Sequence, residues 1–232
     1  EISACLVGSE MCIRDSGWAA APAQAAEPIK IGLVTALSGQ SALAGESITR
    51  GISVAIDEIN AKGGLLGGRP LELVRRDDEG NPAKGVSAAR ELIHREKVAV
   101  LFGGLDTPVA TAIVPLVNQS KTPFMVPWAA GTPITRNGAK PNYAFRVSAV
   151  DEIVDVAMLD YAQASFGAKK PGMILVNNPW GESNERGLRA AMTAKQVELA
   201  GVEKFEANDV DVVPQLTRLK AAGADAPVSY TH

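Results

Sequence analysis

Hydroxyl-bearing, small and aromatic residues follow the apolar runs of this chain, where they could hold a small ligand. Residues 36–46, ALSGQSALAGE, place serines, glycines and alanines between an apolar run and a helical pattern. Thr107 precedes Pro108 at a predicted helix start, where its hydroxyl would cap the helix and Val109 would supply the next free amide. The positive end of a helix can bind a carboxylate, although Thr107 could also be a plain helix cap.

Two tryptophans occupy comparable positions. Trp128 and Trp180 each follow an apolar run and have small neighbours, which after Trp128 are Ala129 and Ala130. A rigid aromatic side chain at the mouth of a strand can form a pocket wall at low entropic cost. The alternative for each tryptophan is a place in the core or at an interface between lobes. The charged run RRDDE, residues 75–79, is expected to be solvent-exposed.

Several classes of chemistry lack the residues that they need. The segment SGQSALAG does not have the three-glycine spacing of a dinucleotide site, and no Gly-Lys-Ser/Thr sequence is present to hold phosphates. Two cysteines, two histidines and no matching spacing argue against a metal site or a histidine-dependent triad. A net charge of −3 without a basic stripe argues against nucleic-acid binding. We therefore expect no cofactor, no metal, no nucleic acid and no enzymatic activity.

The elements that must position these residues alternate between strand and helix patterns from Ile29 onward. Apolar runs predict strands over residues 29–37, 70–79, 98–104, 123–130, 143–149, 172–178 and 201–207. Helical spacing predicts helices that end at Gly63-Gly64, that begin at Asn81-Pro82 and near Thr107, and that cover residues 151–166, 182–200 and 212–222. This alternation is typical of a doubly wound α/β fold with parallel sheets. A crossover into a second lobe fits residues 147–151.

Both ends of the chain differ from this pattern. Residues 1–16 have neither helical nor strand periodicity, and residues 227–232 begin where another buried strand is expected. Both ends resemble translated sequencing-adapter sequence, so Cys5, Cys12 and His232 are expected to be foreign; the alternative is native disordered termini. Residues 23–26, AQAA, fit the small-residue pattern before a signal-peptidase site, and the alternative is an Ala/Pro linker.

Three stretches of the chain resemble periplasmic solute-binding proteins of the branched-chain amino acid ABC-transporter family. They are residues 29–93, with the strand–LSG–helix opening, INAKGG and the DD…NP exit, then residues 100–130 and 173–188. The resemblance runs from about Ile29 to Asp225. It implies two Rossmann-like lobes that close on a ligand like a hinged clamp, with 36–46 as part of the clamp wall.

The resemblance also implies roles for individual residues. Thr107 matches the hydroxyl residue that meets the ligand carboxylate, Trp128 and Ala129 match backbone positions around the ligand head group, and Trp180 matches an aromatic residue that covers the ligand. Asp151 falls at an acidic position near the crossover and could face an ammonium. The chain departs from amino-acid binders at Ala130, where they usually place threonine; Thr132 follows two residues later. It also has Leu43-Ala44 where many of them have an aromatic residue.

The expected protein is a monomeric, exported receptor in the periplasm that passes a small carboxylate-bearing metabolite to an ABC-transporter permease. Branched-chain or related amino acids, amides and aromatic acids remain open as ligands. The expected organisation is a non-native tail and signal remnant over 1–26, a first ligand-binding lobe over 27–147, a partial second lobe over 148–226 and a non-native tail over 227–232. The alternatives are the sensing domain of a receptor on the same fold and a soluble α/β enzyme.

Overall fold

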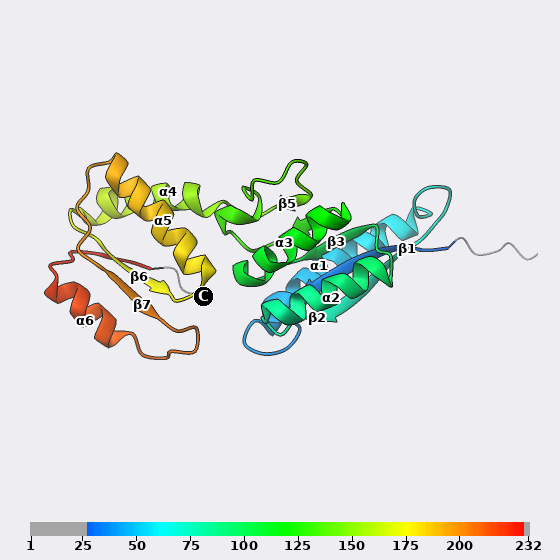
Figure 1. Cartoon of the computed structure of the whole chain (residues 1–232), viewed down its shortest axis with the longest axis horizontal. Helices are drawn as coiled ribbons and strands as arrows, with labels where there is room; N and C mark the ends of the chain where they lie inside the picture. The colour runs from blue at the N-terminus through cyan, green and yellow to red at the C-terminus, as the bar shows by residue number, and fades with distance from the viewer. Residues whose placement is uncertain (1–26, 230–232) are drawn as a thin grey trace, which may run out of the picture.

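Two α/β lobes lie side by side along the long axis of the molecule (Figure 1). The computed structural model describes residues 27–229, so the expected N-terminal tail, Cys5, Cys12 and His232 lie outside the described residues. The first lobe contains a five-stranded sheet and the second a three-stranded sheet, and every strand pair inside them is parallel. The predicted parallel α/β fold with two lobes is therefore confirmed.

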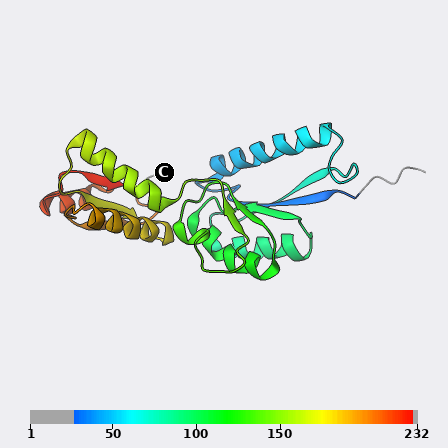
Figure 2. The same cartoon turned by 90° about the horizontal axis from the view of Figure 1, so that it is seen from above.

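The first lobe has the strand order β2-β1-β3-β4-β5. Helix α1 covers one face of this sheet, and helices α2 and α3 cover the other (Figure 2). The elements are β1 (Ile29–Thr35), α1 (Ala42–Ala61), β2 (Leu71–Asp77), α2 (Pro82–His94), β3 (Val100–Gly103), α3 (Thr107–Ser120), β4 (Phe124–Val126), the 3-10 helix η1 (Thr132–Ile134) and β5 (Ala144–Arg146).

The apolar runs of the sequence form the two cores of this lobe. Val34, Leu101 and Phe124 from the strands are fully buried against α2 and α3, as expected for parallel strands covered on both faces. On the opposite face, Ile56 of α1 packs against Ile31 and strand β2. The sheet is thus fixed between two helical layers, with the carboxyl ends of its strands directed to one edge.

Helix ends follow local sequence signals where those signals are strong. Asn81 caps α2, because its side chain accepts hydrogen bonds from the amides of Ala83 and Lys84 and Pro82 occupies the first helical position. Helix α1 ends before Gly63 and Gly64, which both have positive φ. Both predicted boundaries are confirmed.

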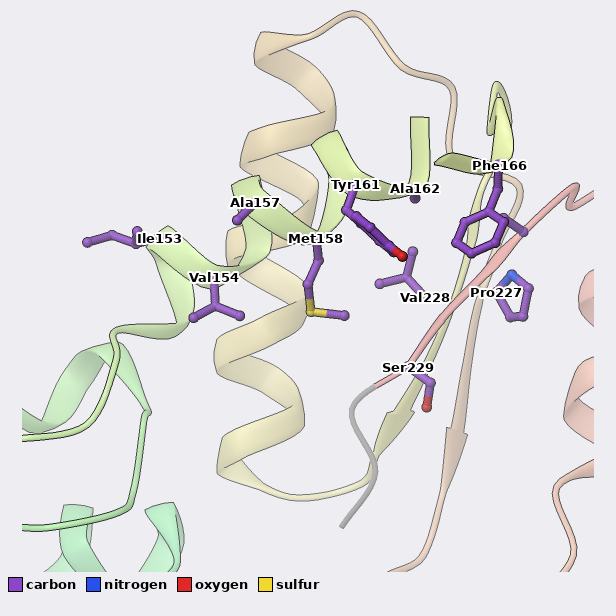
Figure 3. Close-up of a pocket in the computed structure, with 11 residues that line it drawn as sticks. Ile153, Val154, Ala157, Met158, Tyr161, Ala162, Phe166, Pro227, Val228 and Ser229 are labelled. Atoms are coloured by element: carbon purple, nitrogen blue, oxygen red, sulfur yellow. The ribbon is translucent and has the colours of Figure 1, made fainter. Parts of the chain in front are cut away.

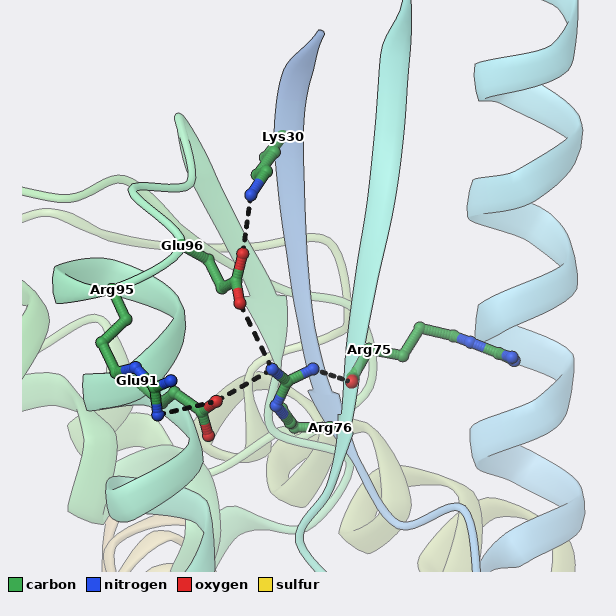
Figure 4. Close-up of polar contacts among 6 residues, drawn as sticks. All are labelled: Lys30, Arg75, Arg76, Glu91, Arg95 and Glu96. Carbon is green, nitrogen blue, oxygen red and sulfur yellow. Dashed lines mark hydrogen bonds and ion pairs between the residues drawn. The ribbon is translucent and has the colours of Figure 1, made fainter.

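A network of ion pairs joins the sheet to α2 on the outer side of the first lobe (Figure 4). Lys30 Nζ lies 2.7 Å from Glu96, and Arg76 lies 2.9 Å from Glu91 and 3.6 Å from Glu96. All four side chains are partly exposed, so each pair contributes at most about 1 kcal/mol. None of these four residues lines the cavity described below.

The second lobe has the strand order β7-β6-β8. Leu159, Met173 and Leu188 join α4, β6 and α5 in one buried cluster. Helix α6 lies beside β6 and β7. The elements are α4 (Asp151–Phe166), β6 (Gly172–Val176), α5 (Pro179–Ala194), β7 (Val202–Phe205), α6 (Val213–Ala221) and β8 (Pro227–Ser229). Strand β8 forms where the sequence predicted another buried strand, and α4 has the predicted bounds.

Helix α5 differs from its predicted range of 182–200. It begins at Pro179, because the side chain of Asn178 accepts hydrogen bonds from the amides of Trp180 and Gly181. This is the same Asn-Pro signal that starts α2, and it was missed here. Trp180 therefore lies in the first turn of a helix rather than in a loop.

A cavity between the two lobes

The residues after β3, β4 and β6 meet in a small cavity of about 60 Å³ between the lobes. Ligands of open parallel sheets bind outside the carboxyl ends of the strands, which is where this cavity lies. Both lobes contribute to its wall, which consists of Leu105, Asp106, Thr107, Pro108, Trp128, Ala129, Ala130, Asn178 and Trp180. Five of the eight residues proposed from the sequence are thus brought together, while Val109, Thr132 and Asp151 are outside this lining.

Thr107 is the first residue of α3 and is 4 % exposed. The helix is preceded by Asp106 as N-cap residue, so the prediction that Thr107 caps the helix is wrong. The Thr107 hydroxyl instead accepts a hydrogen bond of 3.2 Å from the amide of Gly131. A threonine hydroxyl that accepts one bond retains its own proton for donation, so Thr107 can still bind an anion.

The first turn of α3 adds to this donor site. The amides at a helix N-terminus have no acceptor within the helix and carry partial positive charge. Pro108 has no amide hydrogen, which leaves Val109 as the next donor. The Val109 side chain is buried in the first-lobe core, 1 % exposed, so only its backbone could serve a ligand.

The segment 129–132 joins the cavity wall to the second lobe. The amide of Ala129 donates to Gly104 and its carbonyl accepts from Ser148. The amide of Thr132 donates to the hydroxyl of Ser183 in α5 over 3.2 Å. Thr132 therefore contacts the opposite lobe instead of lining the cavity.

The two tryptophans differ in their surroundings. Trp128 is 58 % exposed, whereas Trp180 is partly buried and its amide is held by the Asn178 cap. Asn178 and Pro108, which the site prediction did not include, also line the cavity. The Asn178-Pro179 pair was the available signal for this position, because it directs the first turn of α5 into the space between the lobes.

Asp151 is 2 % exposed and lies behind Trp180. Burial raises the pKa of its carboxyl, and hydrogen bonds from Trp180 and Ser183 together with the charge of Arg146 oppose that rise. Because Asp151 does not line the cavity, the structure gives it no direct access to an ammonium group there.

The segment 36–46 does not line the cavity. Its glycine at position 45 has a packing reason: a Cβ atom at Gly45 would lie 1.9 Å from the Ala36 carbonyl oxygen. The glycine thus allows the first turn of α1 to approach the end of β1. Its proposed part in a clamp wall stays a prediction.

Asp78 is buried, 1 % exposed, at the exit of β2. The expectation that the whole run 75–79 is solvent-exposed is therefore wrong for this residue. Its Oδ1 accepts a bond from Gly80, and its Oδ2 has no hydrogen-bond partner among the described residues. Burial raises the pKa of the Asp78 carboxyl to about 6, and the nearby charges of Asp106 and Asp77 add to the rise.

A larger cavity, about 550 Å³, lies between α4 and β8 in the second lobe (Figure 3). Its wall is almost entirely apolar, with Met158, Tyr161 and Phe166 from α4 facing Val228. Among the described residues, its polar side-chain groups are the hydroxyls of Tyr161 and Ser229. Ligand sites combine apolar walls with a few placed polar groups, so the smaller cavity between the lobes is the better candidate.

Residues 27–229 contain neither a metal-binding cluster nor a membrane-spanning helix. No three His, Cys, Asp or Glu side chains in this part of the chain are grouped so that they could hold a metal ion. Within the same residues, every helix is too short or too polar to cross a bilayer.

The family model, the curated relatives and the solved structures that match this chain all point to the same family. A family model described as periplasmic binding protein matches residues 28–231. The Leu/Ile/Val-binding protein homolog 3 of Brucella melitensis biotype 1 is 27 % identical over 197 residues, which cover 85 % of this chain and 52 % of the relative. The chain thus spans about half the length of the curated relatives that it matches.

Solved structures agree with this likeness. An ABC-transporter solute-binding protein from R. palustris in complex with 4-hydroxybenzoate is 30 % identical, with a TM-score of 0.77 over 88 % of this chain and 54 % of that one. A branched-chain amino acid transporter substrate-binding protein from Streptococcus pneumoniae in complex with isoleucine is 26 % identical, with a TM-score of 0.75 over 88 % and 57 %.

Proposed function

The chain belongs to the periplasmic binding protein family, and from that premise we propose that the complete protein is a non-enzymatic receptor of an ABC importer. It captures a small carboxylate-bearing metabolite between its lobes, outside the cytoplasm, and delivers it to a membrane permease. The observation that carries the proposal is the cavity at the strand ends, to which both lobes contribute a tryptophan. Residues 27–147 and 148–226 act as the two ligand-binding lobes.

The carboxylate of the ligand is assigned to the start of α3. The Thr107 hydroxyl and the Val109 amide donate to it, and the positive helix end favours its charge. The backbone at Trp128, Ala129 and Ala130 surrounds the head group. Among the described residues that line the cavity the only charged side chain is that of Asp106, and none is a Lys or Arg. Hydrogen bonds and the helix end must therefore stabilise the negative charge of the ligand, which suits one carboxylate better than a phosphate chain.

We propose an aromatic acid as the ligand of this cavity. Trp128 and Trp180 lie on opposite lobes, and aromatic pairs in stacked or edge-to-face contact contribute about 0.5–1.5 kcal/mol beyond the area that they bury. A buried ammonium group would need an acidic partner; Asp151 lies outside the lining, so that role would fall to Asp106. The bound benzoate derivative of the R. palustris protein supports this ligand class.

An aliphatic amino acid is the second candidate, because Asp106 lines the cavity. The Asp106 carboxylate could pair with the ammonium group of such a ligand. The isoleucine complex of the Streptococcus pneumoniae protein is the corresponding precedent.

Calorimetric titration of the complete protein separates the two ligand classes. We expect benzoate and 4-hydroxybenzoate to bind, and isoleucine and the uncharged control benzyl alcohol to bind at least tenfold more weakly. Tighter binding of isoleucine would favour the amino-acid receptor. Equal binding of benzoate and benzyl alcohol would overturn the carboxylate site at α3.

A further inference from the structure

The indole ring of Trp180 has a buried partner behind it. Its Nε1 donates to Oδ1 of Asp151 over 3.4 Å, and the Asp151 Oδ2 accepts from Nδ2 of Asn184, also over 3.4 Å. The same Asn184 nitrogen donates to the Trp180 carbonyl over 2.8 Å. We propose that Asp151 is a positioning residue, which orients the Trp180 ring over the cavity and couples that orientation to the segment joining the lobes.

The carboxylate of Asp151 matches the groups that surround it. An ionised carboxylate only accepts hydrogen bonds, and its neighbours in α5 are donors: the Trp180 indole, the Asn184 amide and the Ser183 hydroxyl. A leucine, which has the same branching but no hydrogen-bond acceptor, would leave the partly buried indole N–H without this carboxylate as acceptor. The side-chain oxygens of Asp151 are directed to α5, so Asp151 orients Trp180 and is not assigned a contact with the ligand.

The backbone of Asp151 connects the same site to the first lobe. Its amide donates to the carbonyl of Ala130 over 3.0 Å, and Ala130 lines the cavity. Asp151 is the first residue of α4, directly after the crossover 147–150. Asp151 thus contacts a cavity-lining residue of each lobe. Its amide contacts Ala130 of the first lobe, and its side chain contacts Trp180 of the second lobe.

Both side-chain contacts are longer than the 2.7–2.9 Å that is usual for an N–H donor and a carboxylate. Such bonds can tighten when a ligand completes a site. We therefore expect closure on a ligand to shorten the contact between Trp180 and Asp151. This step rests on the proposed function, whereas the orientation of Trp180 by Asp151 does not.

The test is the solvent exchange of indole N–H protons in the ¹⁵N-labelled 232-residue chain, without any ligand. The Trp180 signal is identified by its loss in Trp180→Phe. We expect it to exchange at least tenfold more slowly than the signal of the exposed Trp128. Asp151→Leu should abolish this protection, and Asp151→Asn, which keeps an acceptor oxygen, should restore most of it.

Glu152→Gln is the matched control. Glu152 is the next residue in the first turn of α4 and pairs with Arg136 of the first lobe, so its loss also removes a carboxylate from this turn. We expect Trp180 exchange at the wild-type rate in this variant. Exchange of Trp180 as fast as Trp128 in the wild type, unchanged protection in Asp151→Leu, or equal loss in the Leu and Asn variants would each overturn the proposal.

If Asp151→Leu does not fold, the wild-type comparison of Trp180 with Trp128 and the exchange rate in Asp151→Asn take its place as the test. Ligand titration then separates this inference from the proposed function. Protected Trp180 exchange without binding of any carboxylate by the complete protein would refute the receptor and leave the positioning role of Asp151 intact.

Discussion

Replacing Asp78 by asparagine should stabilise the protein at neutral pH. Asp78 is 1 % exposed, its Oδ2 has no partner among the described residues, and burial raises the pKa of its carboxyl from 3.8 to about 6. At pH 7.5 the folded protein must therefore keep a buried, ionised carboxylate close to Asp106 and Asp77. Asparagine has nearly the same shape, keeps the acceptor for the Gly80 amide and carries no charge.

The size of the effect follows from the difference between the two pKa values. Each pKa unit corresponds to about 1.4 kcal/mol, so the rise from 3.8 to about 6 costs at most about 3 kcal/mol above pH 6. Between these pH values the folded state binds more protons than the unfolded state. The wild type is therefore most stable, with respect to this group, below pH 3.8 and loses that contribution as the pH rises to about 6.

Urea denaturation and native-state hydrogen exchange of the β1–β3 amides at pH 4.5 and 7.5 measure this difference. We expect the free energy of unfolding of Asp78→Asn to exceed that of the wild type by up to about 3 kcal/mol at pH 7.5 and by clearly less at pH 4.5. A folded variant with no gain at pH 7.5, or with a gain independent of pH, would refute the reasoning.

Asp77→Asn is the matched control for this experiment. Burial alone would raise the pKa of the Asp77 carboxyl, but hydrogen bonds from Ser38 and from the amides of Leu37 and Glu79 outweigh burial and lower the pKa. The ionised form of Asp77 thus stabilises the fold above its unfolded pKa, and this contribution is lost as the pH falls. Its replacement should give no gain at pH 7.5.

Three further predictions concern the cavity and the second lobe. In the complete protein, Trp180→Ala should weaken ligand binding more than Trp128→Ala in calorimetric titration, because the Trp180 ring is held over the cavity whereas Trp128 is assigned mainly a backbone role; equal or reversed effects would contradict the assignment. Gly131→Ala should weaken ligand binding at least tenfold, because the new Cβ would lie 2.3 Å from Thr107 Cγ2, and it should lower the free energy of unfolding by about 1–3 kcal/mol; wild-type affinity would show that the Thr107 position is unimportant. The 232-residue chain should bind a hydrophobic dye at its apolar cavity and bind ligand more weakly than the complete protein; tight ligand binding in calorimetry would refute this.

Much of the fold could be predicted because its signals are local. The run Ile29–Thr35 is apolar and short, and it forms a buried parallel strand. Asn81-Pro82 starts α2 because both residues act on the first helical turn. The family resemblance that the opening segment and the DD…NP exit indicated is confirmed by the match over residues 28–231. For the strand and the helix start, the information lies within a few neighbouring residues.

The errors occur where tertiary contacts compete with local preferences. Thr107 has the right type for a helix cap, but its hydroxyl accepts from Gly131, 24 residues further along the chain. Asp78 belongs to a charged run, but the exit of β2 is covered by α2 and α3: a Cβ atom at Gly85 would lie 3.7 Å from Asp78 and 2.6 Å from Val109. No periodicity in the run RRDDE indicates which of its charges is covered.

The position of Asp151 illustrates the limit most clearly. The family resemblance puts an acidic residue near the crossover and implies that it could face a ligand ammonium, which stays a prediction. Its side chain instead meets Trp180, 29 residues away. A hydrogen-bond donor on the protein thus occupies the acceptor that the ligand was expected to use. Because Asp151 binds the Trp180 indole and not a ligand ammonium, the expected affinity for amino acids is lower. An ammonium would then depend on Asp106 at the cavity wall. The contact between Asp151 and Trp180 is thus one of the arguments for the aromatic acid that we propose as ligand.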